Sequence, residues 1–147
     1  MTPEEFIPLV APGARANREA GVPASVTIAQ AAVESGWGER VIGNNLFGIK
    51  ATPDWMGKVV SFLTHEYEGG QLKQVVATFR EYASWADSIA DHTLFLRHNP
   101  RYAKAFLCDN PECFVQALST AGYSTNPEYA KLLTEIITTH KLEQYDV

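Results

Sequence analysis

Glu34 occupies a position in this sequence that favours proton-transfer chemistry. It ends the apolar run AQAAVE at 29–34, just before the helix-breaking stretch SGWG. A carboxyl group in the last turn of a helix faces the negative end of the helix dipole, and apolar neighbours remove water from around it. Both effects predict a raised pKa, so that Glu34 could act as a general acid. The alternative is a helix-end glutamate that points to solvent or pairs with Arg40.

Two further glutamates lie on a predicted β-hairpin. The segments VVSFLTHEY and LKQVVATFREY are typical of strands, and the turn EGGQ at 68–71 separates them. Pairing about this turn places Glu66 opposite Lys73 and puts Glu66 and Glu68 on one face. Either carboxylate could supply the second polar group that a glycosidase needs across the scissile bond. The alternative is an exposed cross-strand ion pair between Glu66 and Lys73.

Aromatic residues accompany these acids and could bind the apolar faces of sugars. Trp55 and Tyr123 lie in loop-like stretches and are the better candidates for a groove, whereas Phe47 and Trp85 are expected in the core. The aromatic residues of interest are Trp37, Phe47, Trp55, Tyr67, Tyr102 and Tyr123.

Other chemistries find little support in the sequence. The histidines at 65, 92, 98 and 140 lack a metal-ligand spacing and are interpreted as surface or satisfied residues. The segment CDNPEC at 108–113 lacks a second ligand pair, which disfavours structural zinc. Its two cysteines could form a local disulfide if their α carbons come within about 7 Å, and the spacing leaves this open.

The composition is that of a soluble globular protein. The chain has 147 residues, of which 46% are hydrophobic and 20% are charged, and this predicts one domain over 1–147. A net charge of −5 without a Lys/Arg cluster disfavours a nucleic-acid partner. No apolar run reaches the roughly 18 residues of a membrane span, and the N-terminus has no basic signal-peptide region. We expect a monomer without a membrane span.

Helix signals dominate on both sides of the hairpin. Thr2 followed by Pro3 predicts a helix start, and Ser84 opens another helix that ends at 99–100. A last helix is expected to open at 126–127. The predicted fold is therefore α+β and mainly α, a helical domain with one small inserted hairpin at about 58–82.

Several motifs occur in an order that resembles glycoside hydrolase family 73. They are VPASVTIAQAAVESGWGER, NNLFGIKA, THEYEGG, FREYASWADSIADHTLFL, NPRYAKAF and AGYSTNPEYAKLL, and they extend from about residue 20 to about residue 140. The resemblance implies a lysozyme-like fold. It also implies metal-free and cofactor-free hydrolysis of the β-1,4 bond between N-acetylglucosamine and N-acetylmuramic acid in the peptidoglycan glycan strand.

The resemblance also assigns roles to residues. Glu34 corresponds to the general acid and Tyr123 to a tyrosine near it. Glu66 corresponds to the hairpin carboxylate, although EYE at 66–68 leaves Glu68 open. Groove-lining positions map onto Asn45, Phe47 and Gly48. The predicted substrate-binding set is completed by Trp37, Trp55, Tyr67, Glu68 and Tyr102. The loop ERVIG is shorter than in many family members, which affects the expected shape of the groove.

Two mechanisms are compatible with these roles. In an inverting mechanism Glu34 protonates the glycosidic oxygen while Glu66 activates a water, with the carboxyls roughly 6.5 to 9.5 Å apart. In a substrate-assisted mechanism the 2-acetamido group attacks, and Tyr123 stabilises the charged intermediate. A lytic transglycosylase, a muramidase and a non-catalytic glycan-binding module are the alternative functions. We expect action at the bacterial cell wall, either as a phage-type lysin or as an exported domain.

Overall fold

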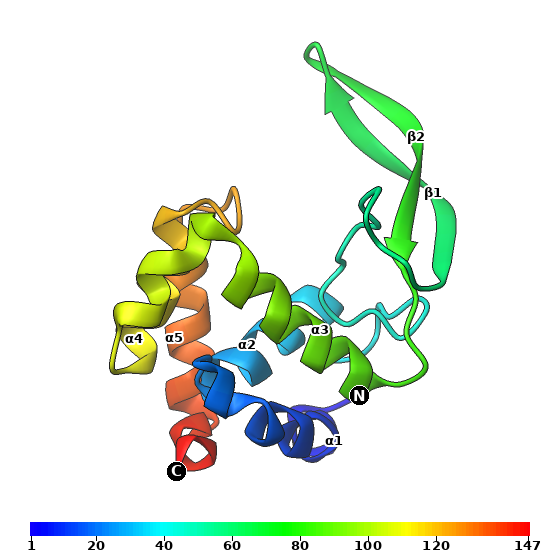
Figure 1. Ribbon diagram of the computed structural model, residues 1–147. Coiled ribbons are helices and arrows are strands. Elements are labelled where there is room, and N and C mark those ends of the chain that lie inside the picture. Colours follow the sequence, from blue (N-terminus) through cyan, green and yellow to red (C-terminus); the bar gives the residue numbers. More distant parts are fainter.

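The computed structural model describes residues 1–147, and it shows a helical body from which one β-hairpin projects (Figure 1). The expected mainly helical α+β fold is confirmed. The α-helices are α1 (Pro3–Ala16), α2 (Ala24–Ser35), α3 (Trp85–His98), α4 (Pro111–Thr120) and α5 (Tyr129–Thr139). Short 3-10 helices are η1 (Arg18–Ala20), η2 (Pro100–Leu107) and η3 (Leu142–Asp146), and the hairpin consists of β1 (Val59–Glu68) and β2 (Gln71–Arg80).

Helix α2 is the buried centre of the helical body. Every residue from 24 to 32 is buried, and α1, α4, α5 and η3 all pack against this helix. Four alanines in the segment allow close approach of the surrounding helices, whose large side chains fill the core. The helix ends where Gly36 adopts a left-handed conformation with φ 58°. Glu34 is thus held in the last turn of this buried helix.

Polar caps fix the ends of the helices largely as predicted. The Thr2 and Ser84 hydroxyls accept hydrogen bonds from Glu5 N and Asp87 N, at 3.2 and 3.1 Å. The last helix begins at Tyr129, later than expected, because the Asn126 side chain caps a turn by accepting from Glu128 N at 2.9 Å.

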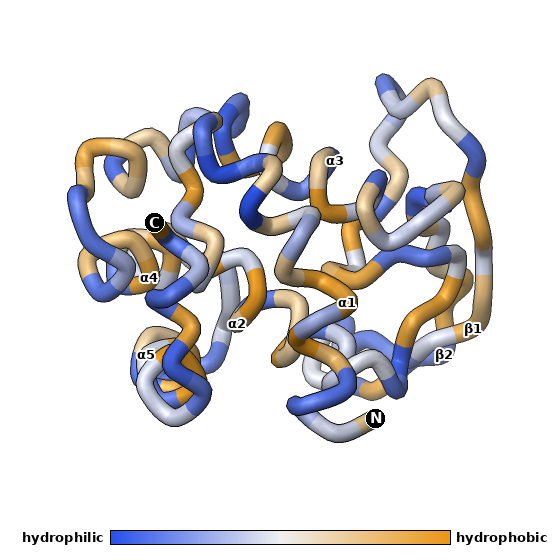
Figure 2. Tube along the Cα trace, turned by 90° about the horizontal axis from the view of Figure 1, so that it is seen from below, coloured by the Kyte–Doolittle hydropathy of each residue, from blue (hydrophilic) through white to orange (hydrophobic).

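The hairpin has the predicted register. Glu66 pairs with Lys73, and the turn glycines 69 and 70 adopt φ values of 58° and 80°, which few other residues tolerate. Phe62 stacks on Phe79 on one face, with ring centroids 4.7 Å apart. Figure 2 shows hydrophobic residues along both strands at the edge of the molecule. In Figure 1 the hairpin projects away from the helical body.

A disulfide joins Cys108 to Cys113, which answers the question that the cysteine spacing leaves open. The bond connects the end of η2 to the first turn of α4. None of the helices combines the length and apolar character that a membrane crossing requires.

Candidate active site

Glu34 lies half-buried in the last turn of α2 and is the central residue of the site. Burial raises the pKa of its carboxyl group, because water no longer stabilises the charged form. A hydrogen bond from the Tyr129 hydroxyl to Oε1, at 3.3 Å, opposes this effect and lowers the pKa. Arg40 does not pair with Glu34; its guanidinium group lies beside Gly36 instead. Glu34 is therefore supported by a tyrosine and not by a cation.

Two stacked tyrosines stand next to Glu34. The rings of Tyr123 and Tyr129 are nearly parallel, with centroids 5.5 Å apart. Gln30 Nε2 donates to the Tyr129 oxygen at 3.1 Å, and Tyr129 in turn donates to Glu34. This chain of bonds runs from the buried middle of α2, through α5, to the carboxyl group.

A cavity of about 360 Å³ opens around Glu34. Segments far apart in the sequence form its wall, namely the end of α2, the loop after it, α3, η2 and the loop after α4. The lining residues are Glu34, Phe47, Gly48, Ile49, Lys50, Thr52, Phe95, Tyr102 and Tyr123. Five of them are predicted site residues; Ile49, Lys50, Thr52 and Phe95 were not predicted.

Asn45 fixes the loop that forms one wall of this cavity. Its side-chain nitrogen donates to the carbonyls of Ile49 and Arg80, both at 2.9 Å, and its oxygen accepts from Ile49 N at 3.1 Å. Gly48, at the turn between these contacts, has φ 67°, a conformation that a side chain would strain. The motif NNLFGIK thus carries the backbone geometry that presents Phe47 and Lys50 to the cavity.

The depression continues beyond Glu34 through shared residues. A neighbouring cavity of about 430 Å³ shares Gly48 and reaches the inner face of the hairpin at Phe62 and Phe79. Another, of about 410 Å³, shares Thr52 and Phe95 and extends toward the end of α3. An extended ligand could therefore lie across the carboxyl group of Glu34.

Glu66 lies outside the Glu34 cavity, on the exposed hairpin. Its Oε1 forms an ion pair with Lys50 Nζ at 3.0 Å, and Lys50 lines the cavity. Lys73, which is opposite Glu66 in the register, lies 3.7 Å from Glu68 instead. The expected Glu66–Lys73 ion pair is therefore wrong, because Lys50 from outside the hairpin competes for Glu66. Of the two hairpin acids, Glu66 is the one linked to the cavity wall.

Three predicted aromatic residues do not line the cavity. Trp37 packs edge-on against Phe6 and His140, with centroid distances of 5.7 and 5.1 Å. The Trp55 ring lies 4.7 Å below the Arg80 guanidinium. Tyr67 is 78% exposed near the tip of the hairpin. Trp37 and Trp55 thus pack against neighbouring side chains, whereas Tyr67 is exposed on the hairpin.

His92 is a buried neighbour of the site that the sequence interpretation missed. It is fully inaccessible, and burial lowers its pKa to about 3, so of the two expected environments, surface or satisfied, the surface one is wrong. The ring stacks on Phe47 at 3.7 Å, and Nε2 lies 3.1 Å from the Tyr123 hydroxyl. Nδ1 has no hydrogen-bond partner. The spacing of His92 from the buried Ile89 and Leu96 was the available signal, since it places all three on one helix face.

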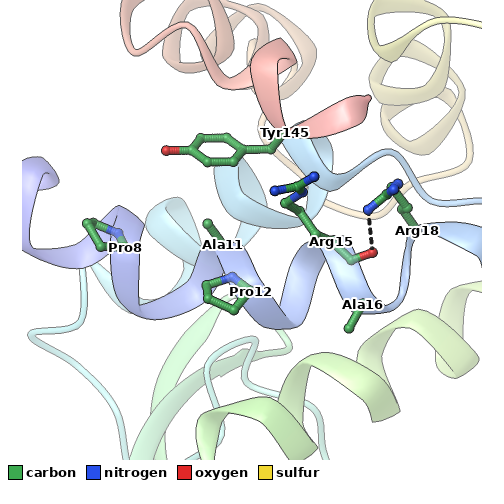
Figure 3. A pocket seen from close by; sticks show the side chains of 7 residues that line it. All are labelled: Pro8, Ala11, Pro12, Arg15, Ala16, Arg18 and Tyr145. Carbon is green, nitrogen blue, oxygen red and sulfur yellow. Dashed lines mark hydrogen bonds between the residues drawn. The ribbon is translucent and has the colours of Figure 1, made fainter.

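A separate cavity of about 550 Å³ lies along α1 and shares no residue with the one around Glu34 (Figure 3). Its polar groups come from Arg15, Arg18 and Tyr145, and no carboxylate lines it. It therefore lacks the group that acid catalysis requires.

One family model matches most of the chain. The model of the glucosaminidase family, described as mannosyl-glycoprotein endo-beta-N-acetylglucosaminidase, matches residues 12–142. The chain belongs to this family, glycoside hydrolase family 73. The match spans α2, the hairpin and α5, so it includes the elements that carry Glu34, Glu66 and Tyr129.

Relatives of this glucosaminidase domain are named as a peptidoglycan hydrolase and as a glucosaminidase. The peptidoglycan hydrolase FlgJ of Escherichia coli K12 is 44% identical over 133 residues, which are 86% of this chain and 42% of FlgJ. The exo-glucosaminidase LytG of Bacillus subtilis is 37% identical, over 83% of this chain and 45% of LytG. The chain thus spans less than half the length of these relatives.

Solved structures of glycoside hydrolase domains share the fold. The catalytic domain of the autolysin Auto from Listeria monocytogenes has a TM-score of 0.88 at 31% identity, covering 99% of this chain and 90% of that one. The glycoside hydrolase domain of FlgJ from Salmonella typhimurium has a TM-score of 0.83 at 38% identity, with coverages of 98% and 91%.

Proposed function

We propose that this chain is a peptidoglycan hydrolase, an endo-β-N-acetylglucosaminidase that cleaves between N-acetylglucosamine and N-acetylmuramic acid. The observation that carries the proposal is Glu34, a desolvated carboxyl group with a raised pKa that lines a cavity together with Tyr102 and Tyr123. A glycosidase needs such a group to protonate the leaving oxygen. The similarity to FlgJ, a peptidoglycan hydrolase, supports this substrate class, and the similarity to LytG, an exo-glucosaminidase, supports the type of sugar released.

The shape of the site supports cleavage within a strand. Two neighbouring cavities adjoin the cavity around Glu34. One shares Gly48 with it and the other shares Thr52 and Phe95, so the depression extends past Glu34. A linear glycan can then occupy sites on both sides of the scissile bond. Flat aromatic walls and polar loop groups suit the two kinds of surface that a sugar ring presents.

In the proposed inverting mechanism, Glu34 donates its proton to the glycosidic oxygen and Glu66 activates a water on the opposite face. Lys50 supports this role for Glu66, since their ion pair ties the hairpin carboxylate to the cavity wall. This mechanism requires the two carboxyl groups to lie roughly 6.5 to 9.5 Å apart when the glycan is bound.

Substrate-assisted hydrolysis is a second candidate because Tyr123 lines the cavity of Glu34 while Glu66 does not. Here the 2-acetamido oxygen attacks the anomeric carbon, and Tyr123 stabilises the charged intermediate. The anomer formed first separates the two mechanisms: proton NMR of early products should show inversion if Glu66 activates water and retention if the acetamido group attacks.

The bond cleaved can be identified directly. Purified peptidoglycan is digested with residues 1–147, the products are reduced with borohydride, and mass spectrometry identifies the sugar alditol. Reduced N-acetylglucosamine is the expected result. Reduced muramic acid would indicate a muramidase, and a 1,6-anhydro sugar would indicate a lytic transglycosylase. Intact peptidoglycan that sediments together with the protein would indicate a glycan-binding module.

We also infer that residues 1–147 act as one monomeric catalytic domain at the bacterial cell wall. The continuous core that joins α1 to α5 and η3 supports one unit. Light scattering of the active protein should give a mass near 16.2 kDa, and a stable dimer would contradict this inference.

A further inference from the structure

His92 lies directly behind Tyr123, on the side away from solvent. The imidazole is buried between Phe47, which stacks on it at an interplanar angle of 9°, and the Tyr123 hydroxyl, 3.1 Å from Nε2. Tyr123 is half-buried and lines the cavity that contains Glu34. The histidine therefore contacts a site residue without reaching the cavity itself.

The surroundings of the ring decide which nitrogen carries the proton. The imidazole is neutral, because burial disfavours its charged form, so it has one N–H and one acceptor nitrogen. Nδ1 has no partner. A proton on Nδ1 would leave a buried N–H donor unpaired, which is rare in proteins, whereas a bare nitrogen there leaves an unpaired acceptor, which proteins tolerate more often. The proton therefore belongs on Nε2, which faces Tyr123.

This tautomer sets the direction of the Tyr123 hydroxyl. If Nε2–H donates to the phenol oxygen, the tyrosine proton cannot point back at His92 and is available to the cavity. The same arrangement exists beside it, where Gln30 donates to Tyr129 and Tyr129 donates to Glu34. Both tyrosines then receive a hydrogen bond from a buried side chain and present their own proton to the site.

We propose that His92 is a positioning residue that donates Nε2–H to Tyr123 and so directs the Tyr123 hydroxyl proton toward an oxygen of the bound N-acetylhexosamine. Only the identity of the bound sugar in this proposal rests on the proposed function; the hydrogen bond between His92 and Tyr123 does not. The alternative is a histidine that merely fills space behind Phe47.

Paired substitutions separate these roles. His92→Gln keeps an N–H close to the position of Nε2, whereas His92→Leu removes it while still filling the space. We expect His92→Leu to lower kcat on peptidoglycan by roughly 10- to 100-fold with little change in KM, and His92→Gln to recover most of the loss. Equal activity of the two folded variants, checked by thermal melting, would overturn the proposal.

The double variant sharpens the test. If His92 acts through the Tyr123 hydroxyl, then adding His92→Leu to Tyr123→Phe should lower kcat by less than twofold beyond Tyr123→Phe alone. Multiplication of the two single effects would mean that His92 acts independently of that hydroxyl, and it would overturn the proposal.

Nitrogen-15 NMR tests the tautomer without any assay of activity. At pH 7 the wild-type protein should show a protonated Nε2 and an unprotonated Nδ1 at His92, with the Nε2 signal shifted in Tyr123→Phe. A protonated Nδ1 would contradict the proposal even if the glucosaminidase activity is confirmed. The expected tautomer in a protein that does not cleave peptidoglycan would instead contradict the proposed function alone.

Discussion

Glu34 and Glu66 carry the same side chain, but the helical body and the hairpin give them opposite environments. Glu34 ends a helix whose first nine residues are all buried, and its partner is a tyrosine hydroxyl that is itself held by Gln30. Glu66 stands on an exposed strand, and its partner is the solvent-exposed ammonium group of Lys50. Burial in the helical body therefore raises the pKa of the Glu34 carboxyl group. The Glu66 carboxylate is instead held by one solvent-exposed ion pair.

The difference matches the two tasks of a glycosidase. A general acid must hold a proton near neutral pH, which requires removal from water, and the core of the body supplies that. A carboxylate that activates water has to stay accessible and charged. The hairpin can provide access because it leaves the core beyond Phe62 and Phe79 and is attached near its base through bonds such as Ala51 N to Thr78 O, at 3.0 Å.

The largest effect is expected at Glu34. Glu34→Gln removes the acidic proton but keeps the size of the side chain, so kcat should fall by roughly 10³-fold or more. Release of reducing sugar from peptidoglycan measures this. Glu135→Gln is the matched control, because it changes an exposed glutamate on α5 that lines none of the cavities around Glu34, and its activity should stay near that of the wild type. Near-normal turnover by Glu34→Gln would exclude both mechanisms.

Glu66 should show a smaller effect that distinguishes the mechanisms. If it activates water, Glu66→Gln should lower kcat by roughly 10²-fold, again relative to Glu135→Gln. If the substrate's own acetamido group attacks, the variant should keep near-normal turnover. Near-normal turnover would mean that the only essential carboxyl group is Glu34, in the helical body.

A substitution at Tyr129 should change the pH profile more than the maximal rate. The Tyr129 hydrogen bond stabilises charged Glu34 and lowers its pKa, so Tyr129→Phe should raise that pKa further. Because the acid must be protonated, the basic limb of the kcat/KM profile should move to higher pH. An unchanged limb, or one that moves to lower pH, would show that the hydroxyl does not lower the pKa of the Glu34 carboxyl group.

Part of this arrangement could be predicted from the sequence because local patterns encode it. The run before SGWG locates Glu34 at a helix end, and EGGQ fixes the register that pairs Glu66 with Lys73. Contacts that join distant segments could not be predicted in this way. Lys50 reaches the hairpin from another loop, so it displaces the cross-strand partner that spacing alone suggests.

The same limit explains why the hydrogen bonds behind the site were missed. Tyr129 and Gln30 are 99 residues apart, and neither forms a local pattern that indicates a role. His92 fits the buried face of α3, but only its contacts with Phe47 and Tyr123 show that it adjoins the site. Three-dimensional packing supplies this information.

The smallest expected effect concerns stability. The folded-state pKa of Glu34 is raised, so the group favours the folded state at low pH and loses that contribution as pH rises through the folded pKa. Glu34→Gln should therefore be more stable than the wild type at pH 8, by up to about 1 kcal/mol, and the gain should shrink by pH 4. Thermal or urea unfolding at the two pH values measures it, and a larger gain at pH 4 would contradict the assigned burial effect.

The most direct test of the central claim is a carbon-13 NMR titration of the Glu34 carboxyl in the free protein. Burial predicts a midpoint above that of a glutamate in a short unstructured peptide, and a higher midpoint still in Tyr129→Phe. A midpoint at or below the peptide value would show that the helical body does not hold Glu34 as an acid, and it would contradict the contrast with the hairpin on which the proposed mechanism depends.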